Sequence, residues 1–508
     1  MKAAPSPPPS QPIFSCAEAA ACEHRLFAGD EAREGPAMER AGGAVAEAVL
    51  RDFLEIGGFP AAGRVLVLAG KGHNGGDALI AARRLLEKFP LARADVVFVF
   101  GERGIRPLAQ RAWRELGHAA RGRVVAIPES GLAPAYDLCL DGIFGFQFRP
   151  PVPRAVALFL GRVNALAVGL RAAVDLPSGL GGAGAPGKAI FRADFTYATG
   201  SVKRPVVEEA SAPWVGRLRY LDLGFFPGEA GKPDLRILTP EVLAPLRALR
   251  ASSSDKRTYG HLFLVGGSRG YPGAILMSVL SALRSGVGLL TAAVPESLAP
   301  SFAARAPEAM WVGLPETPEG GLALEGRRLL LSRLERASAL AVGPGLGRDP
   351  ESLALIREVV AASSLPLVID ADALQPDIVD AGGARRILTP HQGEWERINP
   401  ARRRARHTQA WREAVVVHKG PLTAVAAGSA RYLSPFGGPV LARGGSGDVL
   451  TGLTGGLLAQ TPGDPLLAAC RGVVWHGRAA DALAQAHGQT SVQVTQLLEY
   501  LPQALREG

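Results

Sequence analysis

Cysteine is scarce in this chain of 508 residues, and the four cysteines present are far apart or lack a metal-binding spacing. Cys16, Cys22, Cys139 and Cys470 form no Cys-x-x-Cys pair, which excludes a cysteine-based zinc site and a disulfide framework. Such sparse use of cysteine is typical of the reducing cytoplasm. We therefore expect a cytoplasmic protein.

Long hydrophobic runs are also missing. No stretch of 18 uninterrupted apolar residues occurs, so no membrane span and no membrane partner are expected. Residues 1–12 are rich in proline and serine and lack the apolar segment of a signal peptide. We expect these residues to form a flexible leader.

Positively charged residues outnumber negatively charged ones only slightly. Lysine and arginine number 56 and aspartate and glutamate 47, which gives a net charge of +9 and does not by itself indicate a nucleic-acid partner. A basic run at Arg402, Arg403, Arg404 and Arg406 could contact RNA, but no aromatic side chains interleave it. A solvated loop is the better interpretation, and no nucleic-acid partner is expected.

The composition that remains is that of a globular protein. Hydrophobic residues make up 47% and charged residues 20%, and 62 glycines suit an α/β protein with many tight turns. A single hydrophobic core rarely grows beyond about 250–300 residues, so the length predicts two to four domains.

Apolar strand patterns alternate with helical patterns along both halves of the chain. This alternation predicts parallel sheets with helices on both faces. A turn-rich linker at 226–233 (FPGEAGKP) separates the halves, which predicts two different α/β domains. The expected strands are 64–69, 95–100, 123–127, 136–140, 172–175, 261–265, 288–294, 339–342, 366–370 and 414–418.

In the first half, a glycine-rich segment at 70–77 (GKGHNGGD) follows a strand and opens a helix. Glycines permit close approach of a ligand, and the free amides of a helix N-terminus attract phosphate. A tight turn without a ligand is the alternative. Asn74 and Asp77 favour a ligand, because their side chains could bind a polar group or a cation.

Two further strand ends of this half carry acids, at Asp141 and Asp175. Ligands of open α/β sheets bind beyond the carboxyl ends of the strands, so Asn74, Asp141 and Ser178 are expected to converge as oxygen ligands. Each acid could alone be a helix cap. Three such features at three strand ends favour a binding site.

These motifs resemble those of NAD(P)HX epimerase domains, in the order MERAG (38–42), the glycine-rich loop, DGIFGF (141–146) and DLPSG (175–179). The resemblance implies a Rossmann-like three-layer domain at 13–228 that interconverts the R and S forms of hydrated NADH and NADPH. The chain departs from the family at His73, Ala78 and the segment 180–184.

The same resemblance implies the site residues of this domain. The implied ligands of a potassium ion are Asn74, Asp141 and Ser178. Asp141 is also the candidate acid–base residue, because epimerisation needs proton transfer near the hydrated carbon. The implied substrate contacts are His73, Asn74, Gly75, Gly76, Asp77, Gly145, Phe146, Gln147, Phe148, Arg149, Pro150, Pro151 and Asp175.

In the second half, the strongest local signal is the segment 444–452 (GGSGDVLTG). Glycines and amides at a helix start can stabilise a transferring phosphoryl group, and Asp448 could take the proton of an attacking hydroxyl. An ordinary helix N-terminus capped by Ser446 or Asp448 is the alternative. Four other segments precede it in the chain and favour the functional interpretation, namely GGSRGYPGA, GPGLG, VIDADAL and LTPHQGE.

This half resembles the ADP/ATP-dependent NAD(P)HX dehydratases of the ribokinase-like superfamily, and the matching segments are GGSRGYPGA, GPGLG, VIDADAL, LTPHQGE, HKG and GGSGDVLTG. The resemblance implies a ribokinase-like three-layer domain at 236–508 with Asp448 as catalytic residue. The implied substrate contacts are Ala274, Gly345, His391 and Asp448. The implied nucleotide contacts are Lys419, Gly420, Pro421, Leu422, Thr423 and Gly447.

The family resemblance implies repair of NADHX and NADPHX with ADP or ATP and a magnesium ion. Hydroxide leaves poorly, so the 6-hydroxyl is phosphorylated and phosphate then leaves. The composition favours ADP, and a homo-oligomer is expected. The alternative is a ribokinase-like small-molecule kinase fused to a non-catalytic nucleotide- or RNA-binding domain.

Overall fold

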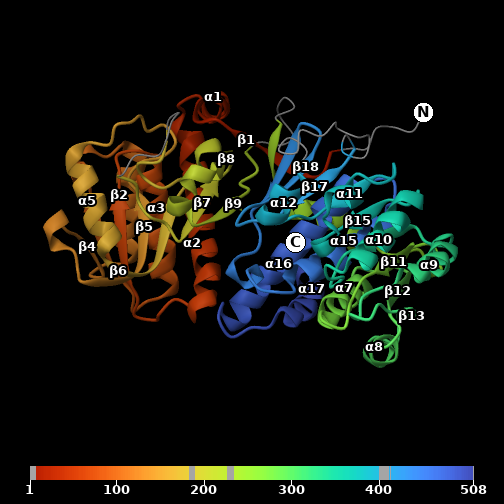
Figure 1. The fold of residues 1–508 in the computed structure, drawn as a ribbon. Coiled ribbons are helices and arrows are strands. Elements are labelled where there is room, and N and C mark those ends of the chain that lie inside the picture. The colour runs from red at the N-terminus through yellow and green to blue at the C-terminus, as the bar shows by residue number, and fades with distance from the viewer. Residues whose placement is uncertain (1–6, 182–188, 226–233, 400–410, 412, 507–508) are drawn as a thin grey trace. The chain divides into compact units, whose positions relative to one another are not determined.

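The computed structural model describes residues 7–181, 189–225, 234–399, 411 and 413–506 (Figure 1). The chain divides into two compact units. One contains Gln11–Pro233 and Gln485–Gly488, and the other contains Met1–Ser10, Asp234–Ala484 and Gln489–Gly508. We call them the N-terminal and the C-terminal unit. The basic run at 402–406 and the expected linker at 226–233 lie outside the described residues.

The N-terminal unit is built on a parallel sheet with the strand order β4-β3-β2-β5-β6-β7-β9. Its strands are β1 (Ser10–Phe14), β2 (Arg64–Ala69), β3 (Arg93–Phe98), β4 (Val124–Ala126), β5 (Ala135–Gly142), β6 (Ala167–Val174), β7 (Phe195–Thr199), β8 (Val202–Lys203) and β9 (Arg217–Leu221). Its helices are α1 (Cys16–Phe27), α2 (Glu31–Phe53), α3 (His73–Lys88), α4 (Pro107–Ala119), α5 (Arg154–Ala165) and α6 (Ala212–Val215).

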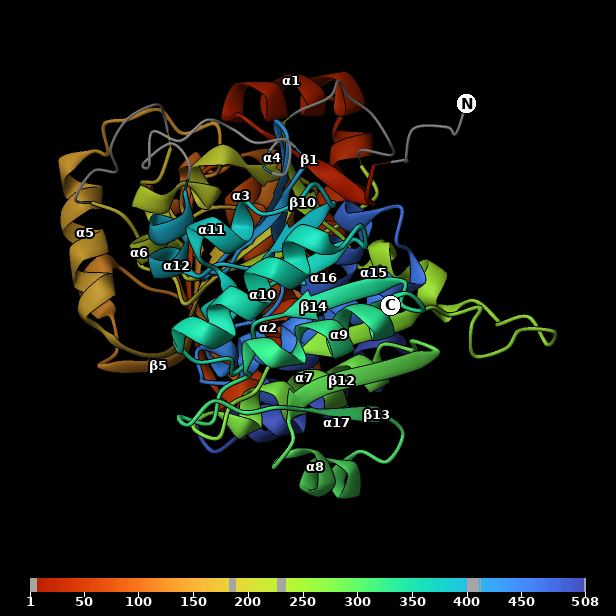
Figure 2. The ribbon, with the colours of Figure 1, turned by 45° about the vertical axis from the view of Figure 1, so that its right-hand side comes forward.

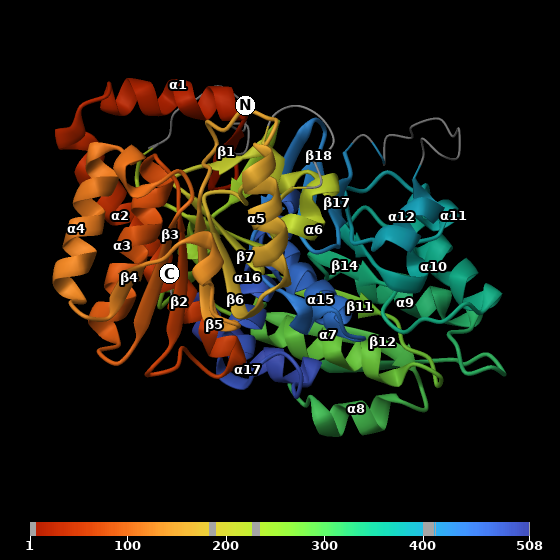
Figure 3. The same ribbon diagram turned by 90° about the vertical axis from the view of Figure 1, so that its left-hand side faces the viewer.

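Helices cover both faces of this sheet, as the continuous apolar strands require (Figure 3). Successive side chains of a strand point to opposite faces. Val65 and Val67 of β2 accordingly pack in one core with residues of α2, α3 and α4. Leu66 and Leu68 pack in a second core with residues of α5.

The C-terminal unit has the strand order β13-β12-β11-β14-β15-β16-β17-β18-β19-β10. Its strands are β10 (Leu235–Leu238), β11 (His261–Val265), β12 (Leu289–Pro295), β13 (Met310–Leu314), β14 (Ala339–Val342), β15 (Leu367–Ile369), β16 (Arg386–Leu388), β17 (Val415–His418), β18 (Thr423–Ala427) and β19 (Ala430–Ser434). Its helices are α7 (Pro272–Arg284), α8 (Ala299–Arg305), α9 (Arg327–Leu334), α10 (Pro350–Ala362), α11 (Pro376–Val379), α12 (Gln392–Ile398), α15 (Ser446–Gln460), α16 (Pro465–His487) and α17 (Leu497–Arg506).

This second sheet also separates two helical layers (Figure 2). Leu262 and Leu264 of β11 pack with residues of α7, α15, α16 and α17. Phe263 and Val265 pack with residues of α9 and α10 on the other face. The expectation of an α/β chain with parallel sheets is therefore confirmed.

The structure differs from the sequence-based expectation in two places. Residues 10–14 form β1, which pairs with β8 in parallel, so the end of the expected flexible leader is a strand. β18 pairs antiparallel with both β17 and β19, whereas only parallel pairing was expected. The connection between β17 and β18 covers only residues 419–422, and a parallel crossover needs a dozen or more residues. Within the described residues, no helix is long and apolar enough to cross a membrane.

Candidate active sites

The first candidate site lies where the strand order of the N-terminal unit reverses. β2 pairs with β3 on one side and with β5 on the other, so the loops after β2 and β5 are neighbours. The Gly70 amide donates to the Gly142 carbonyl at 3.1 Å. A Cβ at Gly70 would lie 1.9 Å from the Ile143 carbonyl oxygen, so this close approach requires glycine.

Three oxygen-bearing side chains converge beside these loops, as the sequence predicts. Asp141 has no exposed surface and accepts hydrogen bonds from the Ser178 amide at 2.7 Å and the Ser178 hydroxyl at 2.6 Å. The Asn74 amide group donates to the Phe144 carbonyl at 2.8 Å, and the Phe144 amide donates to the Ser178 hydroxyl at 2.9 Å. Burial raises the pKa of Asp141 to about 6, although the bonds from Ser178 lower it.

This cluster fits a monovalent hard cation. The donor set is one carboxylate with the neutral oxygens of Asn74 and Ser178, and oxygen ligands suit hard cations. A single negative charge matches a single positive one. The described residues contain no group of three or more His, Cys, Asp or Glu side chains placed to hold a metal ion.

A cavity of about 530 Å³ opens next to the cluster. Among the residues predicted to contact the substrate, those that line this cavity are His73, Asn74, Asp77, Gly145, Phe146, Gln147, Phe148 and Asp175. Gly75, Gly76, Arg149, Pro150 and Pro151 are not among the lining residues. Gly75 packs against the Gly70 backbone, where a Cβ would lie 2.5 Å from the Gly70 oxygen.

The same cavity contains side chains that the sequence reasoning missed. Lys203, at the end of β8, is 1% exposed and forms an ion pair with Asp175. Its Nζ also donates to the Thr199 carbonyl at 3.2 Å and lies 5.0 Å from the centre of the Phe146 ring. Glu23 of α1 and Lys71 also line the cavity. A signal for Lys203 was available, since a buried Asp175 requires a counter-charge.

The second candidate site lies at the equivalent reversal in the C-terminal unit, where β11 pairs with β12 and β14. Gly345 has a φ of +66°, and a Cβ there would lie 2.4 Å from the Tyr271 oxygen and 3.1 Å from the Ala274 Cβ. The structure thus brings Ala274 and Gly345 together. The Ser268 hydroxyl fixes the loop that contains Gly345 by donating a hydrogen bond to the Gly345 carbonyl at 2.8 Å.

A buried carboxylate organises the charged part of this site. Asp370, directly after β15, is 1% exposed and accepts from Lys419 Nζ at 2.9 Å and from the Thr451 hydroxyl at 2.6 Å. Burial alone would raise the pKa of Asp370, but Lys419 and Thr451 hold it below its usual value. Burial likewise acts to lower the pKa of Lys419, whereas Asp370 and Glu394 raise it above its usual value.

Asp448 lies in the first turn of α15, beside this ion pair. The helix begins after Gly445, which provides no side-chain cap. The Ser446 amide donates to the Arg443 carbonyl at 3.3 Å, and the amides that follow it at the start of α15 can bind an anion. A Cβ at Gly447 would lie 3.2 Å from Lys419 Nζ. Burial and the Asp370 carboxylate raise the pKa of Asp448 to about 7.

His391 caps a helix as well as lying in the predicted substrate segment. Its Nδ1 accepts from the Gly393 amide at 3.0 Å, and the His391 amide donates to Glu394 at 2.8 Å. Glu394 Oε2 lies 3.8 Å from Lys419 Nζ, which links this cap to the ion pair. Of the other predicted nucleotide contacts, Gly420, Pro421 and Leu422 form the turn that leads from Lys419 to Thr423 at the start of β18.

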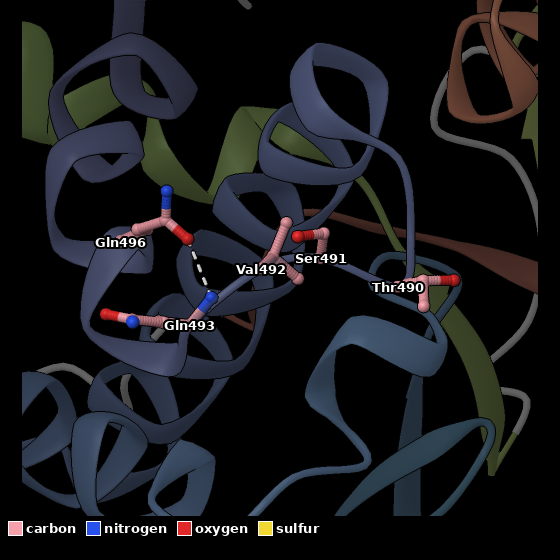
Figure 4. Close-up of a pocket in the computed structure, with 5 residues that line it drawn as sticks. All are labelled: Thr490, Ser491, Val492, Gln493 and Gln496. Carbon is pink, nitrogen blue, oxygen red and sulfur yellow. Dashed lines mark hydrogen bonds between the residues drawn. The ribbon is translucent and has the colours of Figure 1, made fainter.

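A separate pocket of about 430 Å³ lies near the end of the chain (Figure 4). It is lined by Thr490, Ser491, Val492, Gln493 and Gln496. The Gln493 amide donates to the side chain of Gln496 at 2.6 Å. None of the five lining side chains ionises near neutral pH, so this pocket offers no acid–base chemistry.

Comparisons with known proteins match both halves of the chain. Residues 262–503 match the family described as NAD(P)H-hydrate dehydratase, and residues 35–205 match the family described as YjeF-related protein N-terminus. The bifunctional NAD(P)H-hydrate repair enzyme of Gloeobacter violaceus is 38% identical over 98% of each chain. That of Moorella thermoacetica is 34% identical over 92% of each chain.

One solved structure that is similar to this chain covers about half of it. It is the ADP/ATP-dependent NAD(P)H-hydrate dehydratase of Bacillus subtilis co-crystallised with ATP and Mg²⁺. It is 29% identical, covers 53% of this chain and 97% of its own, and has a TM-score of 0.44.

Proposed function

The chain belongs to the bifunctional NAD(P)H-hydrate repair enzymes, and on this premise we propose which residues perform each of its two reactions. The enzyme interconverts the R and S forms of hydrated NADH and NADPH and dehydrates the S form back to NAD(P)H. The alternative of a small-molecule kinase fused to a binding module is not favoured by these relatives.

The epimerase reaction is assigned to the N-terminal unit. Asn74, Asp141 and Ser178 hold a potassium ion, and the adjacent cavity of about 530 Å³ holds the hydrated nicotinamide ring. When bound, the ion would supply positive charge to this site. The convergence of the three oxygen-bearing side chains from three strand ends supports this assignment.

The predicted substrate segments are assigned to the wall of this cavity. His73 and Asp77 approach it from the start of α3, and Gly145 to Phe148 approach it from the loop after β5. Asp175 completes the wall and is held by Lys203. Arg149, Pro150 and Pro151 follow directly in the chain and stay predicted contacts.

The dehydratase reaction is assigned to the C-terminal unit, with Asp448 as the general base. Asp448 takes the proton of the substrate hydroxyl, whose oxygen then bonds to the terminal phosphorus of the nucleotide as the bond to the nucleotide's bridging oxygen breaks. Phosphate next leaves with the carbon–oxygen bonding pair, and a proton lost from the neighbouring ring carbon restores the double bond. The single observation that carries this assignment is the position of Asp448 in the first turn of α15, after the glycines that open the helix, where burial raises its pKa to about 7.

The nucleotide is assigned to the surroundings of the Asp370–Lys419 pair. Lys419 to Thr423 and Gly447 contact ADP or ATP, and Ala274, Gly345 and His391 contact the hydrated ring. The 3.2 Å from Lys419 Nζ to the position of a Cβ at Gly447 supports a shared phosphate site. A magnesium ion bound with the nucleotide would neutralise its phosphate charge.

We also assign the enzyme to the cytoplasm and expect it to self-assemble. All four cysteines are free thiols, which is typical of a reducing compartment. The expected homo-oligomer stays a prediction.

One experiment tests the function as a whole. The protein is incubated with a mixture of R- and S-NADHX, with and without ADP or ATP, and the near-ultraviolet absorbance of NADH is followed. We expect complete conversion of both forms with nucleotide and none without it. Conversion of only the S form would contradict an active epimerase unit, and accumulation of a stable phosphorylated product would contradict the dehydratase.

A further inference from the structure

One face of α1 lines the epimerase cavity. Ala20, Glu23, His24 and Phe27 follow the helical spacing of three and four residues, and all four are lining residues. Glu23 is partly buried there and makes no hydrogen bond or ion pair with any described residue. An unpaired carboxyl group therefore faces the space assigned to the substrate.

The charges around this cavity do not balance. Four carboxyl groups line it, Glu23, Glu34, Asp77 and Asp175, and the buried ammonium group of Lys203 pairs directly with Asp175. Asp77 Oδ1 is buried and has no hydrogen-bond partner. Because like charges in a partly buried site oppose ionisation, the unpaired carboxyl groups bind protons more readily than exposed ones.

The pKa values follow this arrangement. Burial raises the pKa of Glu23 to about 7; the nearby Lys203 lowers it, while Asp175 and Glu34 raise it. Burial, Asp175 and Glu23 also raise the pKa of Asp77 well above its usual value. A group that titrates near the working pH is suited to both accept and donate a proton.

Asp141 is placed differently. Its carboxylate has no exposed surface, is not among the lining residues, and accepts hydrogen bonds from Ser178 and from the Ile143 amide at 3.3 Å. These bonds reach both oxygens and fix the carboxylate away from the cavity wall. An acid–base residue must instead reach the substrate through the cavity.

We propose that Glu23 is the acid–base residue of the epimerase site, taking the proton of the substrate hydroxyl and returning it to the ring nitrogen. This proposal deepens the function assigned above and depends on the N-terminal cavity being the epimerase site. The proposal gives α1 a catalytic role and limits Asp141 to the role of a cation ligand.

The proposed step conserves atoms and electrons. The carbon that bears the hydroxyl also bonds the ring nitrogen. When Glu23 removes the hydroxyl proton, a carbonyl group forms, the carbon–nitrogen bond breaks with its electron pair on nitrogen, and Glu23 protonates that nitrogen. Rotation of the open-chain aldehyde presents its other face, and the reverse sequence closes the ring with inverted configuration. No oxidant or reductant is needed.

Other ionisable groups also face Glu23 and must be considered in a pH profile. His24 lies on the same helix, and Glu34 of α2 approaches with its partner His73 of α3, whose Nε2 is 3.3 Å from Glu34. The remaining charged groups on the wall are Asp77, Asp175, Lys203, Lys71 and Arg106. Only variants of Glu23 itself can therefore assign a titration to it.

The test compares the full-length protein with Glu23→Gln and with a control, Glu47→Gln, at an exposed position of α2. Epimerisation of R-NADHX is measured from pH 5 to 9. The nucleotide-dependent dehydration of S-NADHX by the same preparations reports enzyme concentration, and urea unfolding of the N-terminal unit reports its folding. A general base typically contributes about 10²–10⁴-fold, so Glu23→Gln should lose that factor in kcat at unchanged dehydration. In wild type, kcat/KM should decrease as the pH drops below about 7, and this acidic limb of the pH profile should be absent in Glu23→Gln.

The outcomes separate the proposal from the function on which it depends. If wild type does not epimerise, the assigned function is wrong. If wild type epimerises and Glu23→Gln keeps its rate and pH profile, the role of Glu23 is wrong. Should Glu23→Gln fail to fold, Glu23→Asp decides: a lowered kcat with the limb retained supports the proposal, and an unchanged kcat overturns it.

Discussion

Lys419 Nζ lies 2.9 Å from Oδ1 of Asp370, in a pair whose carboxylate is almost completely buried. The two residues are 49 positions apart and reach the site from β17 and β15. The pair places one positive charge beside the N-terminus of α15, where phosphate is expected. The pair also affects stability, because removing one partner leaves the charge of the other buried without a counter-charge.

Replacing Lys419 by methionine should destabilise the C-terminal unit and weaken nucleotide binding. Removing one partner of a buried pair costs about 3–5 kcal/mol, and the lower end applies because the Lys419 side chain is 23% exposed. We expect a loss of about 3 kcal/mol in urea unfolding of the C-terminal unit, and a nucleotide KM raised by at least about tenfold. The exposed Lys256→Met is the control. Unchanged nucleotide KM would contradict the assigned phosphate site.

Replacing Asp448 by asparagine should remove the base of the dehydratase and leave the amides of α15 intact. We expect the dehydration rate to fall by about 10²–10⁴-fold with little change in nucleotide affinity. The exposed Asp377→Asn serves as the control. Near-normal turnover of Asp448→Asn at saturating nucleotide would show that Asp448 is a cap or a positioning group.

The pH dependence of dehydration should also identify Asp448. A base acts in its deprotonated form, and the pKa of Asp448 is raised to about 7, so the wild-type rate should fall as the pH drops below about 7. The rate profile of wild type, compared with Asp448→Asn between pH 5 and 9, checks this. A wild-type rate that is flat across that range would contradict it.

Replacing Asp141 by asparagine should abolish epimerisation and leave dehydration of the S form intact. The substitution removes the one carboxylate of the cation cluster and disturbs the bonds from Ser178 at 2.6 and 2.7 Å. Both activities are measured on one preparation of the full chain. Equal loss of both would mean that Asp141 has a structural role that reaches beyond its own unit.

Residues 236–508 should convert S-NADHX to NADH when expressed alone. The C-terminal unit has its own sheet with a core on each face, so it contains the apolar contacts that it needs to fold. We expect the R form to be left largely unconverted apart from slow spontaneous epimerisation. An insoluble or inactive fragment would contradict the predicted domain boundary.

Much of the sheet architecture is predictable from local patterns. β2, β11 and β14 have the predicted bounds, because each contains at least four consecutive apolar residues and ends directly before a glycine. The helix start expected within 444–452 is that of α15, which begins at Ser446. The antiparallel β18 and β19 were not predicted, because their alternation is weak and their pairing depends on β17.

The candidate sites were likewise predictable from the sequence only in part. Asn74, Asp141 and Ser178 could be placed together because parallel strands end at one edge of a sheet, and Asp448 could be placed at a helix start because glycines precede it. These inferences require only local sequence and the rule of strand ends. The separate roles that Asp141 and His391 have as a buried acceptor and a helix cap could not be inferred in this way.

Local sequence thus determined the strands, the turns and the family motifs, because backbone preference and apolar spacing act over a few residues. Tertiary structure alone decided that Glu23 of α1 faces the cavity with Asp77 and Lys203, and that Lys419 pairs with Asp370. Those relationships join segments that are 49 to 180 residues apart in the chain (419 − 370 and 203 − 23). Their charges and burial, and hence their pKa values, exist only once the core has brought them together.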